Sequence, residues 1–487
     1  MAEERCFLPA TELAERIASG DLSPVEVVDA YLDRIERRND VVNAYVTITG
    51  DRARRAAREA ARAVSRGDDL GPLHGVPIAI KDLFAFKAGV RHTFGSRVFA
   101  EREYVPDSDA PVVERLERAG AIVLGKTNTP EFGNRATTDN ALVGTTVTPF
   151  APGRTAGGTS GGSAAAVADG LAALAQGSDA GGSIRIPASC CGVYGLKPSF
   201  GRVPNGSRPN AFAEHTPFVQ HGPLARTVAD AAVMLDAVAG PHPDDPFTLP
   251  SPDESYLDAV DRPIDGMTVA YSPDLGTFVV DPEVRTAVEA VVEALADAGA
   301  DVVEVDVTYD HSPEEIRDAW RTLFQVLMAD VAMKIEVQHG MDLLEEHRDG
   351  IDPLFVRIVE AGRRYSAVEY KRADVVRTDV YDSIQAVLTA HDLLVTPTLA
   401  VPPFDADLVG PSEIDGQAVD PFIDWILSWP FNMTDHPAAS LPAGFTGDGL
   451  PIGAQLVGRR FADGDVLAAS AACERHNPWR DAYPPSP

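Results

Sequence analysis

Two glycine-rich turns near the middle of the chain place a serine among small neighbours, as acyl-transfer chemistry requires. They read GGTSGGS at residues 157–163 and GSDAGGSIRIP at residues 177–187. Glycines before a serine permit positive φ and let a substrate approach the main chain. The N–H groups of residues 180–183 can converge on one point and stabilise an oxyanion. Ser183, beside these donors, is therefore well placed for acyl transfer.

A nucleophilic serine also needs a base, and the run GVPIAIKD at residues 75–82 offers a lysine. Lys81 ends an apolar strand, where it shares a face with Ala79 and is carried into or beside the core. Desolvation would lower the lysine pKa from about 10.4 towards neutrality, and a neutral amine accepts a serine proton. The hypothesis depends on position, because a lysine at a strand end more often extends its amine to water.

Three other chemistries match these turns less well. A glycine-rich loop also binds phosphate, but no lysine lies between Lys126 and Lys197, so the Walker spacing is absent. Metal-dependent hydrolysis is disfavoured because the eleven histidines show neither H-x-x-x-H nor H-x-H pairing. The run GTSGG at residues 158–162 matches the nucleophile elbow G-x-S-x-G, with Ser160 as nucleophile. That interpretation needs a later histidine, and the candidates are His215, His221, His391 and His436.

Short apolar runs alternate with helices from about residue 76 onward, and these elements must position the two turns. The alternation predicts an α/β fold with helices on both faces of a sheet. The expected strands cover residues 76–81, 121–124, 267–271, 301–307 and 393–396, and the expected later helices cover residues 282–298, 313–338 and 366–390. The first 66 residues are predicted to be helical. Residues 150–206, rich in glycine, serine and alanine, are predicted to form the tightly turned centre of one domain.

The charge balance limits the partners. The chain has 73 acidic and 42 basic residues and a formal net charge of −31. Such a field repels nucleic acid and anionic membranes, so neither is an expected partner. An acidic, lysine-poor surface is typical of proteins adapted to high salt, although acidic mesophilic enzymes share it.

The cysteines and the apolar runs predict a cytoplasmic protein. Four scattered cysteines form neither a disulfide framework nor a zinc motif, and we expect them to be reduced and buried. These are Cys6, Cys190, Cys191 and Cys473. No segment has the pattern of a secretory signal, and no apolar run reaches the length that a membrane span needs.

Together these segments resemble the amidase signature family over nearly the whole chain. The matching runs are HGVPIAIKD at 74–82, GKTN at 125–128, GGTSGG at 157–162, GGSIRIP at 181–187, CGVYGLKP at 191–198, TPT at 396–398, HPAASLPAGF at 436–445 and LPIGAQLVG at 450–458. The resemblance implies one large α/β domain over residues 1–487 with a mixed central β-sheet. It also implies that the helical segment 1–66 packs on this domain and that the signature core lies at about residues 157–206.

The resemblance further implies a Ser–Ser–Lys triad, with Ser183 as nucleophile and Lys81 as base. In the family the middle member is a serine on a cis peptide bond, 24 residues before the nucleophile. Counting back from Ser183 leads to Thr159 instead of Ser160. Threonine keeps a hydroxyl that can both donate and accept, although its methyl group restricts χ1. We therefore expect Thr159 to relay the proton, with Ser160 as the alternative.

The remaining site residues also follow from the resemblance. Ala180, Gly181 and Gly182 match the oxyanion donors, and Asp179 and Arg185 match positions that brace the site. The implied activity is an amidohydrolase that cleaves a carboxamide C–N bond through an acyl-enzyme. It needs a small-molecule amide and water, no cofactor and no metal, and the expected form is a monomer or homodimer.

Two other functions stay open at this point. One is the glutaminase subunit of a tRNA-dependent amidotransferase, which would use the same residues. Against it, the C-terminal run at residues 477–485 resembles the tails of free-standing amidases. The other is a non-catalytic scaffold, whose mark would be loss of Ser183 or Lys81. The substrate pocket is expected to involve residues 310–365 and 402–432, and the apolar candidates are Phe324, Leu327, Met328, Trp425, Trp429 and Phe431.

Overall fold

A mixed sheet of eleven strands runs through the part of the chain that the computed structural model describes, residues 2–480 and 483. Its strand order is β1-β3-β2-β6-β8-β7-β14-β15-β11-β9-β10. Strand β2 is parallel to both β3 and β6, and β9 is parallel to both β10 and β11, whereas the other neighbours are antiparallel. The mixed sheet predicted from the family resemblance is thus confirmed.

The bounds of the elements are as follows. The strands are β1 Tyr45–Ile48, β2 Pro77–Lys81, β3 Ile122–Thr127, β4 Asp139–Asn140, β5 Gly144–Thr145, β6 Leu174–Asp179, β7 Tyr194–Lys197, β8 Gln220–Ala225, β9 Thr268–Tyr271, β10 Asp301–Glu304, β11 Leu393–Pro397, β12 Glu413–Ile414, β13 Gln417–Ala418, β14 Ala438–Phe445 and β15 Pro451–Gly458. The helices are α1 Ala2–Arg5, α2 Ala10–Ala18, α3 Pro24–Val42, α4 Gly50–Arg66, α5 Arg97–Glu101, α6 Pro111–Arg118, η1 Glu131–Gly133, α7 Gly161–Ala168, α8 Arg185–Cys190, α9 Val228–Val238, α10 Tyr256–Ala259, α11 Pro282–Asp297, α12 Pro313–His339, α13 Leu343–Glu346, η2 Arg348–Gly350, α14 Pro353–Gly362, α15 Ala367–Ala390, α16 Pro430–Thr434 and α17 Asp463–His476.

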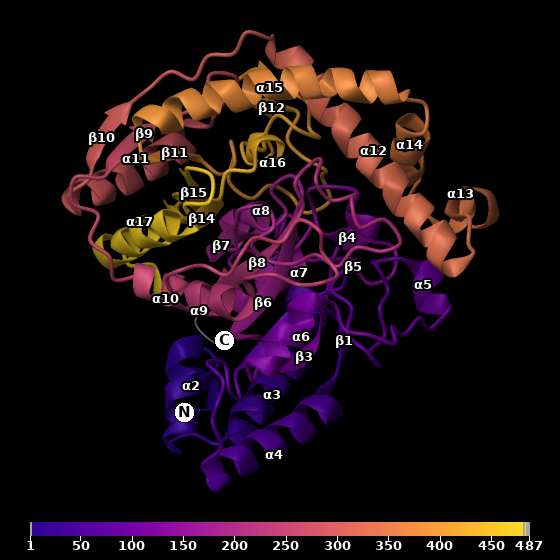
Figure 1. Ribbon diagram of the computed structural model, residues 1–487, viewed down its shortest axis with the longest axis vertical. Helices are drawn as coiled ribbons and strands as arrows, with labels where there is room; N and C mark the ends of the chain where they lie inside the picture. Colours follow the sequence, from indigo (N-terminus) through magenta and orange to yellow (C-terminus); the bar gives the residue numbers. More distant parts are fainter. Residues whose placement is uncertain (1, 481–482, 484–487) are drawn as a thin grey trace.

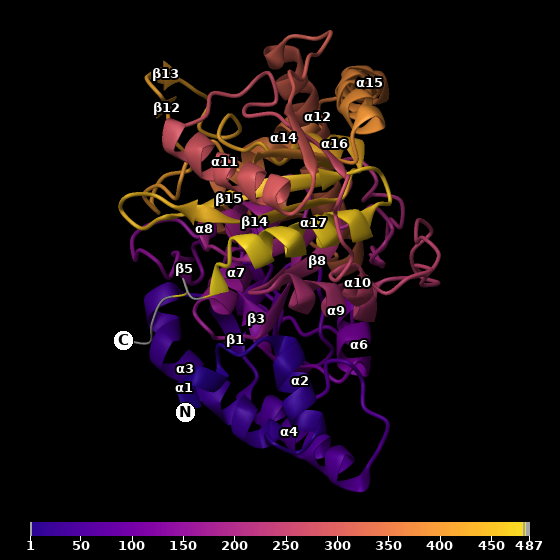
Figure 2. The ribbon, with the colours of Figure 1, turned by 90° about the vertical axis from the view of Figure 1, so that its left-hand side faces the viewer.

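Helices cover both faces of the sheet. On one face α11 and α17 pack on β14 and β15, with α9 beside α17, and Figure 2 shows α11 and α17 lying side by side there. On the other face α8 packs against β14 and β15, and α7 packs against β2, β6 and β8. The N-terminal helices α2, α3 and α4 lie at the opposite end of the molecule from α12, α14 and α15 (Figure 1). The predicted α/β architecture is therefore confirmed.

The N-terminal segment departs from the prediction at one place. Helix α3 ends at Val42, and its C-cap residue Asn43 adopts a left-handed conformation with φ of 53°. The chain then forms the short strand β1, which pairs antiparallel with β3, so the first 66 residues are not wholly helical. Asparagine tolerates this conformation better than most residues, and a four-residue edge strand is too short to produce a clear alternating pattern.

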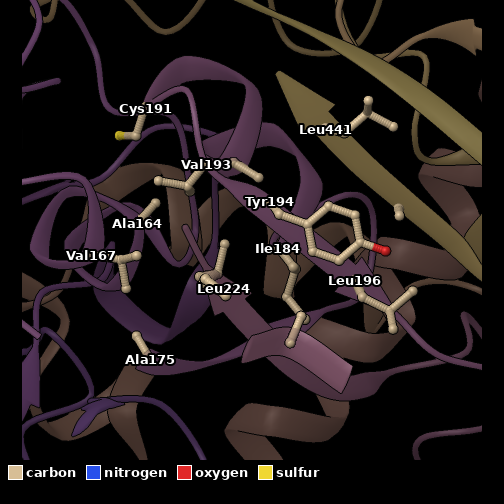
Figure 3. Close-up of a cluster of buried hydrophobic side chains, with 14 of the residues drawn as sticks. Ala164, Val167, Ala175, Ile184, Cys191, Val193, Tyr194, Leu196, Leu224 and Leu441 are labelled. Carbon is tan, nitrogen blue, oxygen red and sulfur yellow. The ribbon is translucent and has the colours of Figure 1, made fainter. Parts of the chain in front are cut away.

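The segment at residues 157–206 contains two buried helices and two buried strands. Small side chains such as Ala164 and Ala175 let α7 and α8 approach the sheet closely, and larger ones such as Ile184 and Leu224 fill the remaining space (Figure 3). All four cysteines are buried. None of the described helices is long and apolar enough to cross a bilayer.

Candidate active site

Lys81 ends strand β2, which lies between β3 and β6 in the sheet, and its side chain is fully buried. Its main-chain N–H donates to Gln176 Oε1 at 3.2 Å, which fixes the end of β2 against the neighbouring strand β6. The amine Nζ is in short hydrogen-bond contact with Thr159 Oγ1. It also lies 3.0 Å from Ser178 Oγ and 3.4 Å from the Ser178 carbonyl oxygen. The lysine predicted from the strand pattern therefore points at hydroxyl groups and away from bulk water.

Burial is the main influence on the protonation of this amine. Desolvation holds the pKa of Lys81 well below its ordinary value, and the negative charge of Asp179 offsets only part of this effect. A lowered pKa favours the neutral amine, which has a lone pair available to accept a proton. The site thus provides the electrostatic condition that a lysine base requires.

Ser183 lies in the turn between β6 and α8, where it is half-buried. The N–H of Ser160 donates to the Ser183 carbonyl oxygen at 3.1 Å, so a main-chain hydrogen bond joins the two glycine-rich turns. Thr159, Ser178 and Ser183 all line the same cavity. The structure thereby places the predicted nucleophile and the predicted relay on one cavity, with the predicted base in contact with the relay.

The Ser183 turn is built around the Asp179 carboxylate. Asp179 Oδ1 accepts from the Gly182 N–H at 2.8 Å, and Oδ2 accepts from the Ile184 N–H at 3.2 Å. Gly182 has φ of +113°, and a Cβ there would lie 1.8 Å from Ser428 Oγ, so only glycine fits. The Gly182 N–H is thus engaged by Asp179 in this structure, and the role of Gly182 as an oxyanion donor stays a prediction.

Three other main-chain donors of this turn stay available. Among the described residues, none accepts a hydrogen bond from the N–H groups of Ala180, Gly181 or Ser183. Such unpaired donors beside a hydroxyl suit an oxyanion, which develops only as a carbonyl is attacked. The interpretation of Ala180 and Gly181 as oxyanion donors therefore stays a prediction, with Ser183 added as a third.

A fully buried polar network holds Asp179 in place. Arg185 donates through Nε to Asp179 Oδ2 at 3.0 Å and through Nη2 to Oδ1 at 2.9 Å. Arg185 also donates to Asn432 Oδ1 at 2.6 Å and to Gln455 Oε1 at 2.6 Å. Burial by itself would raise the pKa of Asp179, but the charge and hydrogen bonds of Arg185 outweigh it and hold the pKa below its ordinary value. The pair braces the turn, as the family resemblance implied.

Removing one partner of this buried pair should destabilise the fold strongly. We expect Arg185→Met to lower the free energy of unfolding by about 3–5 kcal/mol, because Asp179 would be left as an uncompensated buried charge. The matched control is Arg208→Met, which removes an exposed ion pair with Asp244 and should cost at most about 1 kcal/mol. Urea unfolding followed by circular dichroism measures both. Equal midpoints for the two variants would contradict the bracing role.

Ser160, the alternative relay, has a different environment. Its hydroxyl donates to the Ser178 carbonyl oxygen at 3.3 Å and accepts from the Ser178 N–H at 3.3 Å. Thr159 instead contacts Lys81, and the peptide bond between Gly158 and Thr159 is cis. Of the two candidates, Thr159 is therefore the one whose hydroxyl contacts the Lys81 amine, and its relay role stays a prediction.

The histidines required by a nucleophile elbow are engaged elsewhere. His221 Nδ1 lies 2.9 Å from Gln176 Nε2, His436 lies between Thr434 and Gln385, and His391 and His215 contact main-chain carbonyls. Within the described chain, no histidine forms a hydrogen bond with Ser160 or Ser183. The geometry thus favours the lysine over a histidine as base. No group of three or more histidine, cysteine, aspartate or glutamate side chains in the described residues is arranged to hold a metal ion.

A cavity of about 300 Å³ opens at Ser183, and most of its wall is apolar. Of the predicted wall residues it includes Phe324, Leu327, Met328 and Trp429. Trp425 and Phe431 are instead packed in the core. Trp320 lies in the predicted pocket segment 310–365 but was not among the individual candidates. Its ring stacks on Phe324 and Trp429 with centroid separations of 6.1 and 5.5 Å. These rings form a flat aromatic wall. Gly181 packs directly against it, since a Cβ on Gly181 would lie 2.7 Å from the Trp320 ring.

Comparison with known proteins agrees with this geometry. The model of the Amidase family matches residues 26–467. An acylamidase of Rhodococcus erythropolis is 39% identical over 98% of this chain and 97% of its own. A glutamyl-tRNA(Gln) amidotransferase subunit of Carboxydothermus hydrogenoformans is 34% identical over 99% of each chain. The crystal structure of a bacterial aryl acylamidase of the amidase signature family superposes with a TM-score of 0.93 at 36% identity, covering 98% of both chains.

Proposed function

The chain belongs to the amidase signature family of amidohydrolases, and we propose that it works through a Ser183 acyl-enzyme, with Lys81 as base and Thr159 as relay. The observation that carries this proposal is the buried Lys81 amine in contact with the Thr159 hydroxyl, next to the Ser183 turn. Ser183 supplies a hydroxyl at the edge of an apolar cavity. Such an arrangement supplies a nucleophile, a proton path and a base without a cofactor.

The first half of the reaction forms the acyl-enzyme. Ser183 Oγ attacks the amide carbonyl carbon while its proton passes to Thr159 Oγ1, and the Thr159 proton passes to the neutral Lys81 amine. The carbonyl π electrons move onto oxygen, and free N–H groups of residues 180–183 stabilise the resulting oxyanion. When the C–N bond breaks, the proton returns through Thr159 to the leaving nitrogen, and the free amine departs.

The second half of the reaction uses water in place of the amine. Lys81 accepts a water proton through Thr159 as the hydroxide oxygen bonds to the acyl carbon. Collapse of the second tetrahedral intermediate breaks the ester bond and returns the proton to Ser183 Oγ. The products are a carboxylic acid and an amine, and the enzyme regains its starting protonation state.

The relay role of Thr159 predicts a graded series of variants. Thr159→Val keeps the shape of the side chain but has no hydroxyl, and we expect kcat to fall by about 10²–10³-fold. Thr159→Ser should retain most of the activity because the hydroxyl remains. Steady-state kinetics on one amide substrate measures both variants, with Ser160→Ala as the comparison. The relay would belong to Ser160 if Thr159→Val stayed active while Ser160→Ala lost activity.

We propose that the substrates are apolar or aromatic amides, since aromatic and aliphatic side chains form most of the cavity wall. A charged α-amino acid amide would lose hydration in such a cavity without full compensation. We expect kcat/KM for an anilide with a small apolar acyl group to exceed that for glutamine by at least about 10²-fold, a barrier difference of about 2.7 kcal/mol. Phe324→Ala should narrow this gap by about tenfold, because it removes one ring of the wall.

The comparison of the anilide with glutamine also tests the second candidate function, the glutaminase subunit of a tRNA-dependent amidotransferase. Its support is the 34% identity to the amidotransferase subunit of Carboxydothermus hydrogenoformans. The net charge of −31 disfavours an assembly that holds tRNA. Glutamine as the best substrate, or co-purification with a larger tRNA-binding subunit, would support this candidate over the free-standing amidase.

We also propose a domain organisation, a cellular location and an oligomeric state for the enzyme. We propose one catalytic unit over residues 1–487, because α2, α3 and α4 contribute to the same hydrophobic core as the central sheet. The buried thiols of Cys190, Cys191 and Cys473 form no disulfide, which suits the reducing cytoplasm, where the enzyme would act as a monomer or homodimer. Rates of hydrolysis of several amides, measured at low and at high salt, test whether the acidic surface is an adaptation to salt.

A further inference from the structure

The Lys81 amine has more hydrogen-bond partners than the proposed proton path uses. Its contacts are Thr159 Oγ1, Ser178 Oγ at 3.0 Å and the Ser178 carbonyl oxygen at 3.4 Å. Ser178 is a buried residue of strand β6, directly before Asp179, and it lines the cavity. One residue therefore supplies two of the three oxygens around the amine, and the proposed mechanism gives it no role.

A count of donors and acceptors assigns a role to these oxygens. A neutral amine has two N–H groups and one lone pair, whereas an ammonium has three N–H groups and no lone pair. A lone pair can accept only from a hydroxyl that has a proton to give, and in the mechanism that hydroxyl is Thr159. The two N–H groups then have two acceptors left, the hydroxyl and the carbonyl oxygen of Ser178.

From this count we infer that Ser178 is a positioning residue: its two oxygens bind the two N–H groups of neutral Lys81 and aim the lone pair at Thr159. This inference rests on the proposed function, because it presupposes that Lys81 is the base. After proton transfer, the same two oxygens and Thr159 Oγ1 give the ammonium three acceptors, so both protonation states are fully hydrogen-bonded in a buried site.

The main chain around Ser178 is held rigidly enough to do this. Ser160 Oγ accepts from the Ser178 N–H and donates to the Ser178 carbonyl oxygen, both at 3.3 Å. Strand β8 pairs with β6 on one side, where Ser178 lies opposite His221. On the other side Gln176, two residues earlier, accepts from the Lys81 N–H. Ser160 thus has a structural part in the site even though it does not reach the lysine.

Two other titratable groups, Asp179 and His221, interact electrostatically with Lys81. Asp179, on β6, keeps its negative charge because Arg185 holds its pKa below the ordinary range despite burial. His221, on β8, has its pKa lowered to about 4, chiefly by burial, and is neutral above that value. Neither group changes its charge above the pKa of His221, so the acidic limb of the rate profile in that range, where the rate falls as the pH drops, should report Lys81.

Ser178→Ala tests the inference through two readouts. We expect kcat to fall by about 10–100-fold with KM within about twofold of the parent, because the lone pair is no longer aimed. We also expect the acidic limb of the kcat profile to move to lower pH, because the ammonium loses one acceptor and its charged form becomes less favourable. Ser178→Thr, which keeps the hydroxyl, should restore both the rate and the position of the limb.

Ser163→Ala is the matched control, since Ser163 is a buried serine that donates to the Gln176 carbonyl oxygen and does not contact the Lys81 amine. Its acidic limb should coincide with that of the parent. The inference is overturned if Ser178→Ala keeps the parental kcat. It is also overturned if kcat falls while the acidic limb of the kcat profile stays at the parental pH, which is the result expected if Ser178 only supports the fold. If Ser183→Ala and Lys81→Met were also active, the proposed function itself would fail.

Discussion

Ser183→Ala should abolish amide hydrolysis, with kcat lowered by at least about 10⁴-fold, while the protein stays folded. The substitution removes Ser183 Oγ, the atom to which the acyl group bonds covalently in the proposed acyl-enzyme. The side chain is half-buried at the edge of a cavity, so its loss leaves the core unchanged. Steady-state kinetics on an apolar anilide measures the rate, and circular dichroism with thermal unfolding measures the fold.

The control for this experiment is Ser65→Ala. Ser65 is exposed on α4, where its hydroxyl donates to the Ala61 carbonyl oxygen, remote from the site. It should retain parental activity after the same purification. Parental turnover by Ser183→Ala would show that another group attacks the amide, and the scaffold hypothesis would gain support if neither protein hydrolysed any amide.

Lys81→Met should lower kcat by about 10³-fold or more, the second largest effect that we expect. Methionine has nearly the same length and apolar character as the buried lysine stem, so the fold should survive. The variant has no group that can take the proton from Thr159. The parental rate should fall as the pH drops through the lysine pKa, because the amine becomes protonated, and this acidic limb should be absent in the residual activity of Lys81→Met.

Lys371→Met is the matched control for this substitution. Its ammonium is exposed on α15 and pairs with Asp374 at 2.8 Å, so both rate and pH profile should match the parent. The base assignment would be wrong if Lys81→Met retained the acidic limb at the parental position. It would also be wrong if Lys81→Met and Lys371→Met had similar kcat values.

Much of the fold could be predicted from the sequence because the outer elements have regular apolar patterns. The strands at β2, β3, β9 and β11 and the helices α11, α12 and α15 all lie within a few residues of the predicted bounds. The strands β6, β7 and β8 were not predicted individually. They are fully buried on both faces and rich in glycine and small residues, so they show no alternation of polar and apolar side chains.

Site residues could be predicted where a sequence motif indicates their chemistry. They could not be predicted where their role depends only on contacts that form in the folded structure. Burial of Lys81 was expected from its place in an apolar strand, and Thr159 was implied by the family resemblance, in which the middle residue lies 24 residues before the nucleophile. The contact between Ser178 and Lys81 depends on the parallel register of β2 and β6, which a local pattern does not contain. The engagement of the Gly182 N–H by Asp179 likewise depends on a side-chain conformation in the folded turn.

The residues of the cavity wall were also predicted only in part. Phe324, Leu327, Met328 and Trp429 were predicted as wall residues, and they line the cavity. Trp425 was predicted with them but lies buried with its Nε1 donating to the Pro421 carbonyl oxygen at 2.8 Å. Composition identifies large apolar side chains, but only tertiary packing decides which of them face a cavity and which face the core.

Labelling by a serine-reactive fluorophosphonate, followed by peptide mass spectrometry, tests the central claim most directly. We predict a single phosphonylated residue, Ser183, in the parent protein. We also predict that the rate of labelling falls by at least about 10²-fold in Lys81→Met, because the hydroxyl then has no base. Labelling at Ser160, or labelling of Ser183 at the same rate in the parent and in Lys81→Met, would contradict a serine nucleophile activated by a buried neutral lysine.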